Sequence, residues 1–370
     1  MSVESRLVSI LWYVGYYVEF PVPLVDRIGG HWDWNRHVLC DGVRCGYLEV
    51  FRMLYRHRVL KSLRITQAGL QYLSEKSPQR FAEVTARRSQ VSLSHNYGPD
   101  RILRLHALAT AAVMAERIGA VVLPAEKPTL LSKGKPSRQV PYDPEQIYYY
   151  SMPEIREAIQ EFAPDTDAKS SRLVGMILRG RYCYCIYCSG RSRMYWLQAT
   201  EENCVTSIQS LLAARHIPCE VTSQVLIGHT MLVAIKLAKP RTKLTRTYFS
   251  VSQFFDGCYF VTDNTQGDEL LRLIVHRDEQ IRLNRLILKD LADPKQPTRD
   301  YDAVDTTTGQ PVILGYTCDL MQLQNINAAP YGFTQEPRIL CFDYQVQAIQ
   351  QIVGPMLQVA PIQEAMVHES

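Results

Sequence analysis

The sequence lacks any apolar segment long enough to cross a lipid bilayer. Its longest apolar runs, at residues 9–20 and 230–238, fall well short of the roughly 20 residues that a membrane-spanning helix needs. Glu4 and Glu19 flank the first run and no small-residue cleavage site follows it, which predicts a first helix of the mature chain rather than a signal peptide. We therefore expect a cytoplasmic protein with no membrane partner.

The dense cysteines of a disulfide-stabilised domain are also missing. Ten cysteines are spread unevenly over 370 residues, and several lie in apolar runs where a free thiol packs as a small hydrophobic group. Cys183, Cys185 and Cys188 have no second ligand pair at zinc spacing, so we interpret them as core residues. A second group matches no common zinc finger but leaves open a metal that stiffens one loop: His31, His37, Cys40 and Cys45.

Two common hydrolase motifs are absent as well. The chain has neither a Gly-x-Ser-x-Gly nucleophile elbow nor a Gly-x-x-x-x-Gly-Lys-Ser/Thr phosphate loop. A Ser/His/Asp or Cys/His arrangement stays open, because its members need not be neighbours in sequence. We expect no cofactor and no bound metal, and we favour a protein that is not an enzyme while leaving that question open.

Basic charge is concentrated near the N-terminus. Residues 1–105 hold 15 Lys and Arg against 9 Asp and Glu, whereas the whole chain carries only +4, so the remainder is slightly acidic. A basic excess confined to one end predicts a module that binds a polyanion, attached to a nearly neutral body.

The pattern of residues 1–80 predicts a winged helix-turn-helix. Apolar spacing indicates a helix from Val3 to about residue 15, and Pro23 indicates a short second helix that ends at the next glycine pair. After a loop, residues 46–60 predict an amphipathic, cationic third helix, residues 60–65 a short β-segment, and Thr66 the N-cap of a closing helix.

This order resembles the wing and the Thr-x-x-Gly-x-x-Tyr-Leu helix of many bacterial DNA-binding proteins. The third helix would lie in the major groove and the wing would contact phosphates. Five residues would then make the contacts with duplex DNA: Arg52, Arg56, Arg58, Lys61 and Arg64. The alternative is a solvated basic face on a module that docks on another protein.

The rest of the chain predicts a connector and an α/β domain. We expect a helical connector and a mobile, proline-rich loop over residues 81–147, and a mixed sheet flanked by helices over residues 148–370. Strands are expected at 171–178, 183–190, 194–199, 230–238, 257–264, 311–320 and 338–345, with helices at 201–216 and 266–288.

This second part holds further candidate side chains. A possible second basic patch comprises Arg179, Arg181, Arg191 and Arg193. Nearby tyrosines, at 148–150 and at 182, 184 and 187, either stack on unpaired bases or half-bury in a sheet, and we favour burial. Four acids beside strands are expected to form turns and caps, although a site of their own stays open: Asp302, Asp305, Asp319 and Asp343.

The layout resembles the replication-relaxation proteins of Gram-positive plasmids and integrative conjugative elements. The resemblance lies in the expected winged helix, in RLHALATAAVMA at residues 104–115, and in residues 171–202, which are similar to a Ser-Arg-x-x-Gly, Tyr-x-x-Tyr-x-x-Gly and Met-x-Trp run in conjugative transposons. It implies a restriction-endonuclease-like body. The expected strands lack the Asp and the Asp/Glu-x-Lys that would hold Mg²⁺ in such a nuclease, so we expect this body to be degenerate.

These observations favour a non-catalytic, DNA-binding accessory protein of a bacterial mobile element, acting in replication, origin processing or transfer. Its partners would be double-stranded DNA, a second copy of the chain in a homodimer, and replication or transfer proteins. Two alternatives stay open: a nuclease with an unusual or degenerate metal site in the α/β domain, and a transcription regulator that senses a ligand.

Overall fold

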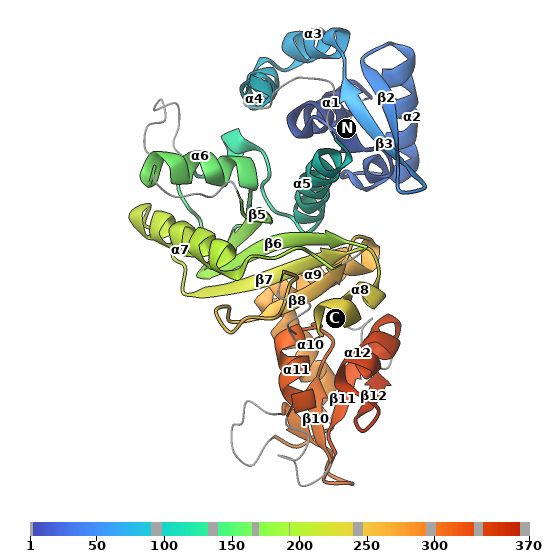
Figure 1. Ribbon diagram of the computed structural model, residues 1–370, viewed down its shortest axis with the longest axis vertical. Coiled ribbons are helices and arrows are strands. Elements are labelled where there is room, and N and C mark those ends of the chain that lie inside the picture. Colours follow the sequence, from blue (N-terminus) through green and yellow to red (C-terminus); the bar gives the residue numbers. More distant parts are fainter. Residues whose placement is uncertain are drawn as a thin grey trace. The chain divides into compact units, whose positions relative to one another are not determined.

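The computed structural model describes residues 3–89, 98–131, 140–164, 170–191, 193–239, 247–293, 301–328 and 336–362. In these ranges the protein is mixed α and β, with three sheets and many helices (Figure 1). The chain divides into two compact units. Unit 1 comprises residues 1–142 and 146–154, and unit 2 comprises residues 143–145 and 155–370.

Unit 1 opens with the predicted first helix, α1 (Val3–Tyr17). Ile10, Leu11 and Val14 on this helix are fully buried, as their spacing of three and four residues indicates. A very short strand β1 (Phe20–Pro21) and a 3-10 turn η1 (Val22–Arg27) follow, the latter at the predicted short second helix.

The predicted third helix over residues 46–60 is wrong. These residues form a hairpin of β2 (Leu48–Tyr55) and β3 (Arg58–Ile65), joined by Arg56 and His57. Both turn residues have positive φ, 45° and 63°, which is the backbone of a two-residue turn whose twist matches the strands. The sequence did not indicate a hairpin here because neither turn residue is the Gly or Asn that usually marks such a turn.

The predicted loop before the hairpin is a helix, α2 (Trp32–Arg44). Only three residues of this helix are buried: Asn35, Val38 and Gly42. Its apolar stripe is therefore too narrow to be recognised in the sequence. β1, β3 and β2 form an antiparallel sheet in that order.

Two further helices of unit 1 lie where the sequence predicts them. Thr66 caps α3 (Gln67–Lys76), because its hydroxyl accepts a hydrogen bond from the Gly69 amide at 3.1 Å. The Ala-rich segment forms α5 (Pro99–Arg117), which belongs to unit 1 with the N-terminal elements. The remaining elements here are α4 (Pro78–Ser89), η2 (Pro124–Glu126), β4 (Tyr148–Ser151) and the start of α6 (Met152–Phe162). Of the predicted proline-rich loop, residues 132–139 lie outside the described ranges.

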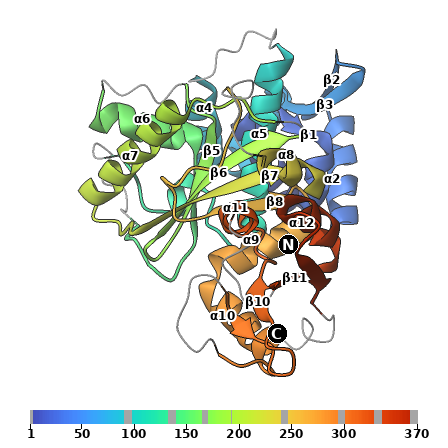
Figure 2. The same cartoon turned by 60° about the horizontal axis from the view of Figure 1, so that its bottom comes forward.

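Unit 2 contains strands that lie side by side in one sheet in the order in which they occur along the chain (Figures 1 and 2). β5 (Leu173–Arg179) pairs antiparallel with β6 (Tyr182–Gly190), as two of the predicted strands. α7 (Gln198–Ala214) then leads to β7 (Val221–Gly228), which is parallel to β6, and β7 is parallel to β8 (Cys258–Thr262).

Three expectations for the strands and helices of this region are wrong. Residues 230–238 form a helix, α8 (Met231–Leu237), and the strand lies just before them in β7. Residues 194–199 contribute one bridge, Tyr195 with Tyr248, instead of a strand. The expected single helix at 266–288 is divided at His276 into α9 (Thr265–Val275) and α10 (Arg277–Leu288).

The C-terminal part of unit 2 has its own small sheet, in the order β12-β11-β10-β9. Two of its strands, β10 (Pro311–Leu314) and β11 (Arg338–Cys341), begin where the sequence predicts strands. The other elements are β9 (Ala303–Val304), α11 (Leu320–Ala328), η5 (Asp343–Gln345), α12 (Val346–Val353) and β12 (Gln358–Pro361). Among the described residues, no helix combines the length and the apolar character that a membrane span requires.

Candidate nucleic-acid interface

Buried polar side chains fix α2 against α1. Arg6 donates from Nε to Asn35 Oδ1 at 2.6 Å and from Nη2 to the Ile28 carbonyl at 2.8 Å. Asn35 in turn donates to the carbonyls of Val25 and Ile28. Both side chains are buried and hydrogen-bonded, so directional hydrogen bonds as well as apolar packing fix the position of α2.

The exposed face of α2 is aromatic and close to neutral. Trp32 and Trp34 are 49% and 39% exposed. Arg36 lies over the Trp32 ring, and its guanidinium forms an ion pair with Asp26 at 2.6 Å. Arg44 is similarly paired with Asp41 at 2.7 Å. Sequence reasoning missed this face because it placed a loop here.

The β2–β3 hairpin has a cationic and apolar outer face. Arg52 and Lys61 are register partners and point to the same side, as do Leu54 and Val59 nearer the turn. All four are exposed, Leu54 by 76%. Arg52, Arg58 and Lys61 form no ion pair with any carboxylate in the described part of the chain. The predicted contact residues therefore lie on strands and a turn, not on a helix.

Arg64 does not belong to this exposed set. Its Nε donates to Glu19 Oε1 at 2.6 Å, its guanidinium lies 3.6 Å from the centre of the Phe51 ring, and its side chain is only 13% exposed. Glu19 is buried, so this ion pair ties β3 to the segment after α1. The expectation that Arg64 faces a ligand on the wing is therefore wrong.

The predicted second basic patch separates into two. Arg179 and Arg181 lie at the turn between β5 and β6, where they pair with Asp278 and Glu220. Arg191 and Arg193 follow the other end of β6. At about 3.3 Å per residue, the two ends of this strand are roughly 30 Å apart.

Most of the candidate stacking tyrosines pack in the interior of the two units, whereas the candidate metal ligands His31, His37, Cys40 and Cys45 are all exposed on or beside α2. Tyr149, Tyr150, Tyr184 and Tyr187 are all almost fully buried, which leaves no face for an unpaired base. Cys183 and Cys185 are also buried, as core residues. Within the described ranges, no three His, Cys, Asp or Glu side chains come together as metal ligands.

Three of the four C-terminal acids accept hydrogen bonds from separate backbone amides. Asp302 accepts from the Leu314 amide, Asp305 from the amides of Thr307 and Thr308, and Asp319 from those of Cys258 and Met321. Asp343 opens η5. Asp305 and Asp319 thus serve a turn and the start of a helix, as we expected, whereas Asp302 bonds a strand that lies 12 residues further along the chain.

A polar cluster that sequence reasoning missed lies at the carboxyl ends of β6, β7 and β8. Arg191 Nη2 lies 2.9 Å from His229 Nε2, and His229 Nδ1 lies 3.2 and 3.3 Å from the two oxygens of Asp263. Each residue directly follows its strand. The available signal was the position of a charged or imidazole side chain after each strand, but β7 itself was not predicted.

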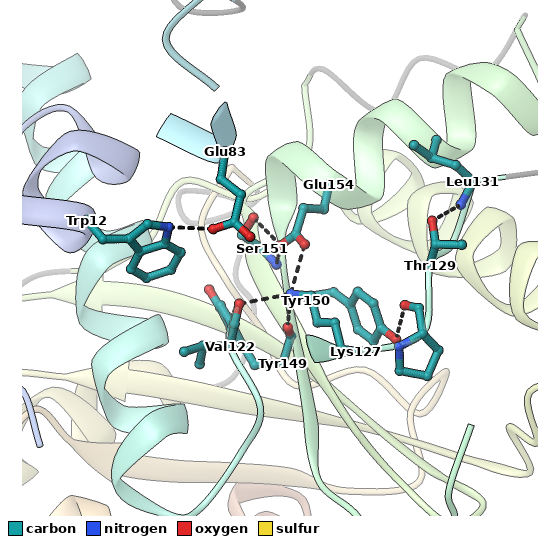
Figure 3. A network of polar contacts seen from close by, with 11 residues as sticks. Trp12, Glu83, Val122, Lys127, Thr129, Leu131, Tyr149, Tyr150, Ser151 and Glu154 are labelled. Atoms are coloured by element: carbon teal, nitrogen blue, oxygen red, sulfur yellow. Dashed lines mark hydrogen bonds and ion pairs between the residues drawn. The ribbon is translucent and has the colours of Figure 1, made fainter. Parts of the chain in front are cut away.

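Unit 1 contains a second polar cluster, centred on a buried lysine (Figure 3). Lys127 pairs with Glu154 at 2.8 Å and donates to the carbonyls of Val122 and Tyr149. Glu154 also accepts from the Ser151 amide and hydroxyl. Burial lowers the pKa of Lys127, against the opposing effect of Glu154. All three ammonium hydrogens have acceptors, so the cluster is a structural link between chain segments.

The comparisons with known proteins add no relative: no family model, no curated protein sequence and no solved structure matches this chain.

Proposed function

We propose that residues 3–76 form a winged helix that binds duplex DNA, with the β2–β3 hairpin as its wing. The proposal is supported by the element order α1, β1, η1, α2, β2, β3, α3 and by the antiparallel sheet order β1-β3-β2. In such a module the helix before the hairpin faces the major groove. That helix is α2, with Trp32 and Trp34 exposed.

The observation that carries the proposal is the exposed positive charge on the hairpin, for which the described residues provide no carboxylate partner. Arg52 and Lys61 lie directly opposite each other on neighbouring strands, where like charges repel and weaken the sheet. Arg56 and Arg58 add charge at the turn. A phosphate backbone offers the counter-charge for these four side chains, and the apolar Leu54 and Val59 can contact sugars in a groove.

Two finer expectations belong to the same proposal. The order of β5, β6, α7 and β7, with an antiparallel pair followed by a parallel strand, supports a restriction-endonuclease-like body. Neither β5 nor β6 contains Asp, Glu or Lys, which favours a non-catalytic role in a mobile element over a nuclease. Such a protein would act in replication, origin processing or transfer of that element.

The test is the salt dependence of binding to a random-sequence duplex. We expect the slope of the logarithm of the binding constant against the logarithm of salt concentration to become shallower by about one in Arg52→Ala, and by about one in Lys61→Ala. The reason is that each phosphate contact releases counterions. Arg181→Ala, an exposed arginine in unit 2 that pairs with Glu220, is the matched control. If both hairpin variants keep the slope of the unmodified protein, the hairpin is not the DNA contact.

A further inference from the structure

The cluster of Arg191, His229 and Asp263 is assembled by the register of three parallel strands. Gly190 at the end of β6 is the partner of Gly228 in β7, and Gly228 is the partner of Thr262 in β8. The His229 amide donates to the Gly190 carbonyl at 2.8 Å, and the Asp263 amide donates to the Gly228 carbonyl at 2.9 Å. These bonds place the side chains of Arg191, His229 and Asp263 next to one another at the carboxyl ends of the three strands.

The strand ends are shaped for close backbone approach. A Cβ at position 228 would lie 2.6 Å from the Phe260 ring, so any residue other than glycine would require that ring to move. Gly190 has φ of 61°, a conformation that most other residues avoid. Both glycines therefore serve the geometry of this edge.

The contacts determine where the imidazole proton lies. A guanidinium can only donate, so the contact with Arg191 requires His229 Nε2 to be the acceptor. The ring proton is then on Nδ1, where it is donated to the Asp263 carboxylate. Asp263 thus orients the ring and balances the positive charge that it would carry with a second proton.

The cluster is open to a ligand. The side chains of His229 and Asp263 are 42% and 31% exposed, and Arg191 is exposed. Behind them, burial and the neighbouring Asp263 raise the pKa of the Cys188 thiol, which keeps that group neutral. Within the described ranges, the imidazole contacts one cation, Arg191, and one anion, Asp263.

We propose that Arg191 and His229 bind a terminal phosphate, the phosphomonoester of a nucleotide or of a 5′ end of DNA. Ligands of open α/β sheets bind beyond the carboxyl ends of the strands, which is where this cluster lies. When phosphate binds, the Arg191 N–H donors turn from His229 to the phosphate oxygens, and the released Nε2 takes up a proton and becomes a second charged donor. A terminal phosphomonoester offers three unesterified oxygens to these two donors, whereas an internal phosphodiester offers only two.

The experiment is titration calorimetry of the full chain with inorganic phosphate and with a deoxynucleoside 5′-monophosphate at pH 7.5. Each ligand is measured in two buffers of different ionisation enthalpy, which reports proton uptake. We expect Arg191→Ala to weaken binding by about tenfold or more. His229→Gln should abolish the proton uptake, and Asp263→Asn should reduce it. Arg181→Ala, at the opposite end of β6, should change neither quantity.

The source of the phosphate is distinguished with DNA. Duplexes with 5′-phosphate or 5′-hydroxyl ends are compared on an Arg52→Ala/Lys61→Ala background, so that loss of hairpin binding cannot be mistaken for loss of this site. A preference for the phosphorylated end that disappears in Arg191→Ala indicates a DNA end, and binding of the mononucleotide without that preference indicates a free nucleotide. The proposal is overturned if the folded protein binds neither ligand, or if Arg191→Ala and His229→Gln bind both unchanged.

Discussion

At the scale of single residues, the motif Thr66-x-x-Gly69-x-x-Tyr72-Leu73 has a physical role at every named position. Thr66 caps α3, and the Tyr72 ring packs on the Tyr47 ring with centroids 4.7 Å apart. Leu73 is fully buried. Gly69 lets the helix approach the backbone so closely that a Cβ would collide with the Tyr47 carbonyl. The motif therefore docks α3 beside the start of β2.

Gly69→Ala should accordingly destabilise the protein by about 1–3 kcal/mol, since the obstructing atom is backbone and cannot rotate away. Gly98→Ala is the control, because a Cβ at that N-cap position has no contact within 4 Å among the described residues beyond its chain neighbours. We expect the control to cost less than about 1 kcal/mol. Urea unfolding of both variants measures the difference, and equal losses would contradict the close approach.

A second residue-scale prediction concerns pH. His106 on α5 lies 2.8 Å from the Ser62 hydroxyl on β3, and burial lowers its pKa from 6.5 to about 4. Between these two values the unfolded chain binds a proton that the folded chain does not, so the free energy of unfolding falls as pH falls from about 6.5 to about 4. The loss attributable to His106 is at most about 3 kcal/mol.

The measurement compares urea unfolding at pH 7.5 and at pH 5 for the unmodified protein and for His106→Gln. Other groups titrate in both proteins, so the informative quantity is the difference between the two declines. We expect a shallower decline in His106→Gln. Identical declines would show that the imidazole is protonated equally in the folded and unfolded chains.

At the scale of elements, the hairpin is held by its strands against an unfavourable turn. Arg56 and His57 both adopt the left-handed region, which disfavours residues with a side chain. The cross-strand pairs from Leu48–Ile65 to Tyr55–Arg58 nevertheless keep an unbroken register. The strand pairing, not the turn sequence, thus specifies this element.

His57→Gly should therefore stabilise the protein by about 0.5–1 kcal/mol, because glycine adopts this backbone without strain. DNA affinity should stay the same, since Arg52, Arg56, Arg58 and Lys61 are all retained. Thermal unfolding and a binding isotherm measured on the same preparation check both expectations. A lower midpoint of unfolding would mean that His57 makes a stabilising contact that outweighs the turn strain.

At the scale of the whole molecule, each unit contains charged clusters that link distant chain segments. In unit 1, Lys127 and Glu154 connect the segment after α5 with β4 and the start of α6 (Figure 3). Trp12 on α1 similarly donates to Glu83 on α4 at 2.7 Å. Burial raises the pKa of Glu83. These partners are far apart in sequence, so they form only when the unit is assembled.

Lys127→Ala should destabilise unit 1 by about 3–5 kcal/mol, because it leaves the Glu154 carboxylate without its cation and two backbone carbonyls without their donor. The paired variant Lys127→Met/Glu154→Gln should recover a substantial part of that loss, since it removes both charges and retains volume. Urea unfolding of the two variants makes the comparison. If the paired variant is as unstable as Lys127→Ala, the cost comes from lost packing and not from the unpaired charge.

Elements whose signals are local could be predicted from the sequence alone. The N-cap at Thr66, the helices α1, α5 and α7, and the strands β5, β6 and β8 follow from capping chemistry and from apolar period. Local patterns failed at residues 31–60, where α2 buries only a narrow stripe and the hairpin turn lacks glycine. The secondary structure of such short segments depends on the residues that pack against them, and these residues are distant in sequence.

Which charged side chains are exposed and which contact one another depends on how the chain folds. Arg52 and Arg64 look alike in sequence, yet Arg52 points outward, whereas Arg64 lies beside Phe51 and pairs with the buried Glu19. His229 and Asp263 are 34 residues apart and become neighbours because β7 and β8 are parallel and end together. Register and burial are properties of the folded chain, so residue type and spacing alone could not supply them.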